Sequence, residues 1–107
     1  MFENVLVALG YNENESIKRQ FERIISNTDL SQAELDHVIS LNEKLSNIES
    51  FVALSNSEDV LKIKCQSNDK AKIKEFNEIV KDWGEKYNLK LKKVDGKETY
   101  YILGRKD

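Results

Sequence analysis

The sequence predicts an α+β domain in which a helical layer precedes a small βαββ unit. Three observations support this prediction. Apolar residues recur at three- and four-residue steps through the first half of the chain, as on one face of a helix. Strict alternation of apolar and charged residues begins near residue 60, which is typical of half-buried strands. The dipeptide Asp95-Gly96 then separates two alternating segments, as at a β-hairpin turn.

The first expected element is a short helix over residues 2–9. Its apolar residues share one helical face, and Gly10 follows in the position where helices commonly end. The run Val5-Leu6-Val7 leaves a buried strand open as the alternative, because consecutive apolar residues suit either structure.

Two longer amphipathic helices are expected next, over residues 13–27 and 31–49. Each has apolar residues on one side and charged residues on the other. Ser31 and Glu34 have the spacing of a capping box, which marks the start of the second helix. Residues 51–54 either extend that helix or form a short strand.

The second half is expected to contain a strand over 60–65, a helix over 69–87, and a hairpin with strands over 89–94 and 98–104. The apolar face of this helix is aromatic and should point into the core, together with two aliphatic residues: Ile73, Phe76, Val80, Trp83 and Tyr87. Asn88 is a plausible left-handed stop for the helix.

A two-residue type I′ turn at Asp95-Gly96 fixes which hairpin residues should face each other. It pairs Leu91 with Tyr100, and it places Lys93 opposite Glu98 as a charge pair. The same turn pairs Leu89 with Ile102 and Val94 with Lys97. One face of the sheet is then apolar and packs on the helix. The other face carries lysines.

Charge is distributed unevenly along the 107 residues, although the net charge is only −2. Residues 1–59 carry four basic and eleven acidic side chains, a net −7, whereas residues 60–107 carry thirteen basic and eight acidic ones, a net +5. We expect a single domain with an acidic helical part (1–58) and a basic βαββ part (59–107). The asymmetry either marks an interaction surface or holds the two parts together.

Cysteine content and hydropathy indicate a cytoplasmic protein. Cys65 is the single cysteine, so no internal disulfide can form and a reducing compartment is expected. The apolar run over residues 5–9 is too short to span a bilayer, and acidic Glu3 stands where a signal peptide would carry basic residues. We therefore expect no membrane association.

Residues 59–106 resemble the later part of the TusA/SirA-like sulfur-carrier family. The matching features are a short strand, a helix with a tryptophan near its end, and a hairpin ending in aromatic and basic residues: Val60–Ile63, Trp83-Gly84, Leu89–Leu91 and Tyr100–Lys106. The resemblance implies a two-layer fold. The family acts through a Cys-Pro-x-Pro motif, whereas this sequence has no proline, so the functional cysteine of the family does not carry over.

Two residues are candidates for chemistry. Cys65 lies just ahead of the helix expected at 69–87, and a helix N-terminus can lower the pKa of a thiol and make its sulfur nucleophilic. Strand alternation, in contrast, places Cys65 among apolar residues, where the thiol would be inert. His37 follows Glu34 in a Glu-x-x-His spacing, but metal sites of that type need further ligands, so a solvated residue is expected and no metal. No cofactor-binding glycine pattern occurs, and we expect neither cofactor nor enzymatic activity.

Three functions follow as hypotheses, with a small binding or adaptor module placed first. The N-terminal helices offer more apolar surface than a three-stranded sheet needs, which favours a protein partner or a homodimer. The second hypothesis is a divergent sulfur-handling protein that uses Cys65. The third is a weak binder of single-stranded nucleic acid, in which lysines contact phosphates and a tyrosine stacks on bases: Lys62, Lys64, Lys90, Lys92 and Tyr101.

Overall fold

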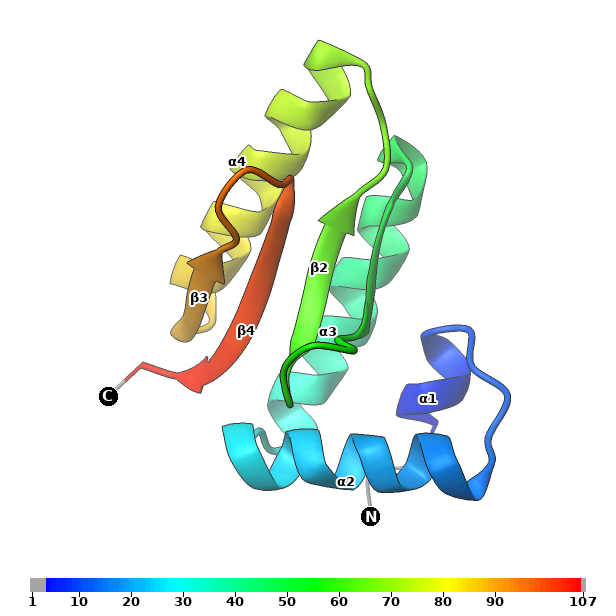
Figure 1. Cartoon of the computed structure of the whole chain (residues 1–107). Helices are drawn as coiled ribbons and strands as arrows, with labels where there is room; N and C mark the ends of the chain where they lie inside the picture. The colour runs from blue at the N-terminus through cyan, green and yellow to red at the C-terminus, as the bar shows by residue number, and fades with distance from the viewer. Residues whose placement is uncertain (1–3, 107) are drawn as a thin grey trace.

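The computed structural model describes residues 4–106 and confirms an α+β fold with helices before the sheet (Figure 1). In chain order the elements are α1 (Val5–Ala8), α2 (Glu15–Thr28), α3 (Gln32–Leu45), the 3₁₀ turn η1 (Ser46–Ile48), β1 (Ser50–Leu54), β2 (Leu61–Cys65), α4 (Lys70–Lys86), β3 (Leu89–Lys93) and β4 (Thr99–Arg105).

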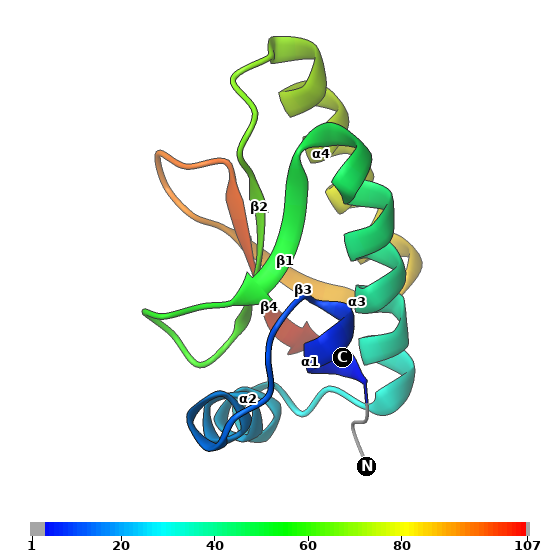
Figure 2. The same cartoon turned by 90° about the vertical axis from the view of Figure 1, so that its right-hand side faces the viewer.

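The four strands form one antiparallel sheet in the order β1-β2-β4-β3. Helices α3 and α4 cover one face of this sheet, while the opposite face carries no helix over its centre (Figure 2). Helix α2 runs across one end of the sheet, and α1 packs beside α3. The sheet therefore has a buried face and an open face.

Local caps define the helix ends, and those formed by Ser31 with Glu34 and by Asn88 are the predicted ones. The Asn14 side chain accepts a hydrogen bond from the Ile17 N–H at 2.9 Å, and Ser31 and Glu34 form the expected capping box. Helix α4 begins after Asp69, whose carboxylate accepts from the Ala71 N–H at 2.8 Å. Asn88 ends α4 with a φ of +55°.

The two apolar runs that suit either a helix or a strand adopt different structures. Residues 5–8 form a helix, and residues 2 and 3 of the expected helix lie outside the described part of the chain. Residues 50–54 form the edge strand β1, which follows the third helix and a left-handed turn at Glu49. The sheet accordingly has one strand more than the expected βαββ unit.

The hairpin is present, but the expected register is wrong by two residues. Leu91 pairs with Ile102 and Lys93 with Tyr100, and the pairing then shifts so that Leu89 lies opposite Arg105. The φ angle is +75° at Gly96 but is not positive at Asp95. The Lys97 N–H donates to the Val94 carbonyl at 3.2 Å. This turn is of type II rather than type I′. Because side chains alternate with period two, a slip of two residues leaves the faces unchanged.

One hydrophobic cluster unites both parts of the chain beneath the helices. Trp83 is buried, with 8% of its surface exposed, and the expected ion pair between Lys93 and Glu98 is present at 3.6 Å. The largest fully buried side chains come from helices and strands alike: Ile24, Leu35, Leu45, Leu61, Ile63, Phe76, Leu89 and Ile102.

Candidate nucleic-acid interface

The open face of the sheet displays lysines next to aromatic rings in two rows that run across the strands. In the first row, Lys62 on β2 pairs with Tyr101 on β4, which pairs with Lys92 on β3. In the second row, Phe51 on β1 pairs with Lys64 on β2, which pairs with Thr99 on β4. Neighbouring strands lie about 4.8 Å apart, so the side chains within each row are close neighbours.

Two loops project on the open side of the sheet (Figure 2). A hollow of about 240 Å³ lies between them. One is the β1–β2 connection around residues 55–59, and the other is the β3–β4 connection around residues 94–98. The residues that line the hollow are Ser55, Asn56, Ser57, Lys62, Lys64, Val94, Lys97, Thr99 and Tyr101.

The hollow is basic and rich in hydrogen-bonding groups. Lys62, Lys64 and Lys97 supply three ammonium groups, and no lining residue within 4–106 has a carboxylate. None of these three lysines forms an ion pair with another residue of the described chain. Ammonium groups without internal partners are available to an anion, above all to phosphate oxygens.

Tyr101 is held at the edge of the hollow by the β1–β2 loop. Its hydroxyl lies 3.0 Å from the Ser57 hydroxyl. Hydrogen bonding from Ser57, and secondarily from Ser55, lowers the pKa of Tyr101 below its usual 10.0, and the charge of Lys97 acts in the same direction while that of Glu58 opposes it. The ring is partly exposed and its hydroxyl contacts the β1–β2 loop, so the ring can serve as a stacking platform.

The structure brings together most of the residues that sequence reasoning assigned to this face. Lys62, Lys64 and Tyr101 line one hollow, and Lys92 lies directly beside Tyr101. Lys90 lies further along β3, opposite Gly104 and beyond the register shift, and does not line the hollow.

Sequence reasoning missed two contributors to the open face. Phe51 could not be assigned to a sheet face because residues 51–54 suit either a helix or a strand, although Phe-Val-Ala-Leu has the length of an edge strand. Lys97 was placed in the hairpin without a role, because only the folded turn directs it toward β2.

Cys65 and His37 lie elsewhere. Cys65 faces the core with 8% of its surface exposed, and the N-terminus of α4 is capped by Asp69 rather than by the thiol. His37 is only partly exposed, because its ring stacks on Tyr87 with the centroids 3.7 Å apart. Within residues 4–106, no three side chains of His, Cys, Asp or Glu gather in a metal-ligating arrangement.

Comparison with known proteins gives no match: no family model fits the chain, and no curated protein or solved structure is detectably similar to it. Every helix among residues 4–106 is too short or too polar to span a bilayer.

Proposed function

We propose that this chain is a non-enzymatic binding protein that holds single-stranded nucleic acid on the open face of its sheet. The observation that supports the proposal is the hollow itself, where Lys62, Lys64 and Lys97 converge beside Tyr101 without a carboxylate among the lining residues described. Phosphates would contact the lysines, and bases would stack on Tyr101 and on the partly buried ring of Phe51.

The two bordering loops favour a single strand over a duplex. Both loops project on the side of the open face, so a ligand must lie between them (Figure 2). A flexible single strand can follow such a passage and turn its bases toward the sheet, whereas a duplex presents its bases only within its grooves.

Partners of other classes have less geometric support. The case for a protein partner or homodimer rests on surplus apolar surface on the N-terminal helices. The apolar stripes of α1, α2 and α3 are largely buried, however, and Val7, at 60% exposure, is the one large apolar side chain exposed among residues 4–106. Sulfur chemistry at Cys65 would require a buried thiol to become accessible. Both hypotheses stay predictions, with nucleic acid placed ahead of them.

Titration of dye-labelled 12-mers of rU and dT, followed by fluorescence anisotropy, tests the proposal. Each phosphate contact to a single strand contributes about −0.7 to the slope of log K against log salt, so three contacts predict a slope of roughly −2. We expect the double variant Lys62→Gln/Lys64→Gln to lose about tenfold or more in affinity and to flatten this slope.

Two matched controls identify the face and the stacking contact. Lys74→Gln/Lys81→Gln removes the same charge from α4, on the helical side of the sheet, and should retain binding if the open face is the site. Tyr101→Leu should weaken binding roughly 5- to 100-fold, while Tyr101→Phe keeps the ring and most of the affinity. No binding to either 12-mer at low salt, or equal losses in the two lysine pairs, would contradict the proposal.

A further inference from the structure

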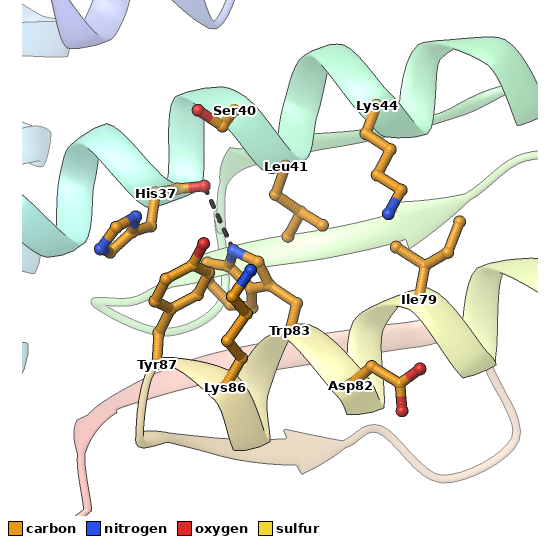
Figure 3. A pocket seen from close by; sticks show the side chains of 9 residues that line it. All are labelled: His37, Ser40, Leu41, Lys44, Ile79, Asp82, Trp83, Lys86 and Tyr87. Carbon is orange, nitrogen blue, oxygen red and sulfur yellow. Dashed lines mark hydrogen bonds between the residues drawn. The ribbon is translucent and has the colours of Figure 1, made fainter.

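A second hollow, also of about 240 Å³, lies between α3 and α4 on the side of the sheet opposite the nucleic-acid interface (Figure 3). Helix α3 contributes His37, Ser40, Leu41 and Lys44. Helix α4 contributes Ile79, Asp82, Trp83 and Lys86, and Tyr87 follows as the C-terminal cap of α4. We call it the interhelical groove.

One end of the interhelical groove is closed by a fixed aromatic cluster. The His37 and Tyr87 rings stack at 3.7 Å with an interplanar angle of 16°, and Trp83 meets Tyr87 edge-on at 6.2 Å. The indole N–H of Trp83 donates to the His37 carbonyl at 3.2 Å, which ties α4 to α3 (Figure 3). Because that donor is already engaged, the indole can offer a ligand only its apolar ring.

The floor is apolar and the rim is charged. Leu41, Ile79 and the Trp83 ring line the floor, while Lys44 and Lys86 extend from facing helices into the space between them (Figure 3). Lys86 lies over the Tyr87 ring at 5.4 Å. Neither lysine forms an ion pair within residues 4–106, and Asp82 is the one carboxylate in the lining.

We propose that the interhelical groove binds a small aromatic carboxylate, with the ring on the apolar floor and the carboxylate between Lys44 and Lys86. The two ammonium groups exceed the single charge of Asp82, so the rim complements an anion. The volume is below the roughly 300–1,000 Å³ of sites for drug-sized ligands, which limits the ligand to about one ring with a short chain. Because the aromatic wall is already packed, the side chains that binding must order are mainly those of Lys44 and Lys86.

Intrinsic fluorescence provides the test, because Trp83 is the only tryptophan in the sequence and lies in the groove. Titration of the full chain with 3-phenylpropanoate should change the emission saturably, with a dissociation constant of roughly 0.1–3 mM for a ligand of this size. The uncharged amide, 3-phenylpropanamide, should bind at least about fivefold more weakly, since it cannot pair with the ammonium groups. Hexanoate, which has the charge without the ring, should also bind more weakly.

Variants test whether 3-phenylpropanoate binds in the interhelical groove. Lys44→Gln/Lys86→Gln should weaken 3-phenylpropanoate binding roughly tenfold, and Ser40→Phe, at an exposed rim position, should block the groove. Lys74→Gln on the same helix as Lys86 is the matched control and should bind as the native chain does. The proposal is overturned by the absence of saturable binding up to about 20 mM, by equal affinity for acid and amide, or by native affinity in the double lysine variant.

Discussion

At the scale of single residues, two side chains protect the outer edge of the sheet. β1 is an edge strand, and its outward N–H groups would otherwise be available to another chain. The Val52 N–H donates to the Asn42 side-chain oxygen at 2.8 Å, and the Leu54 N–H donates to the Tyr11 hydroxyl at 2.9 Å. Helix α3 and the segment after α1 thus supply hydrogen-bond acceptors for these two N–H groups of β1.

Asn42→Ala should therefore destabilise the fold out of proportion to the size of the change. It leaves the N–H of buried Val52 without its acceptor, which costs about 1–3 kcal/mol. Urea unfolding measures the difference, and Asn47→Ala is the matched control, because Asn47 is exposed on η1 and makes no side-chain hydrogen bond within residues 4–106. Equal stability of the two variants would show that the Asn42 contact is dispensable.

At the scale of elements, the sequence predicts whatever depends on neighbouring residues and fails where distant segments must meet. Helix ends follow from local caps such as Ser31 with Glu34, and the two sheet faces follow from alternation. Asp-Gly is compatible with more than one turn type, so the hairpin register was not determined locally. The hollow on the open face needs residues 55–57 beside Lys97, and the interhelical groove needs His37 beside Tyr87, and no spacing rule connects such pairs.

The irregularity in the hairpin has a clear cause at Gly104. Pairing passes from Leu91 with Ile102 to Lys90 with Gly104, so Leu103 is left without a partner on β3 and β4 bulges. Gly104 has a φ of +145°, and a Cβ there would lie 3.0 Å from the Thr28 carbonyl oxygen at the end of α2. Glycine thus allows β4 to approach α2 closely.

Gly104→Ala should accordingly lower the free energy of unfolding by about 1–3 kcal/mol, through backbone strain and this close contact together. Gly96→Ala is the control: its φ of +75° is also unfavourable for alanine, but no atom lies within 4 Å of the added Cβ. The excess loss in Gly104→Ala, measured by urea unfolding, isolates the contact with α2. A larger loss of stability in Gly96→Ala would show that the close approach of β4 to α2 adds nothing to the cost of alanine at position 104.

At the scale of the whole molecule, the charge asymmetry of the sequence joins the two parts. Arg105 of β4 contacts Asp29 at 2.9 Å and Glu34 at 3.5 Å, and Lys72 of α4 pairs with Glu49 at 2.7 Å. Basic groups of the second half thus meet acidic groups of the first on the helical side and at the end of the sheet. The lysines of the open face take no part in these pairs and leave that surface basic.

The surroundings of Glu34 should make the stability of the fold depend on pH in the acid range. Burial alone would raise the pKa of Glu34, but hydrogen bonds from Ser31 and the charge of Arg105 together hold it below the usual 4.5. A carboxylate with a lowered folded-state pKa stabilises the fold fully above its unfolded pKa, and this contribution is lost as the pH falls through the folded value. The melting temperature should therefore decline as the pH falls below about 4.5.

Glu34→Gln, which cannot ionise, should show a shallower decline, whereas Glu75→Gln, at an exposed position on α4, should follow the native curve. Parallel curves for the native chain and Glu34→Gln would assign the acid sensitivity to other carboxylates. A shallower curve would show that the Glu34 carboxylate, held by Ser31 and to a lesser degree by Arg105, accounts for part of the acid sensitivity.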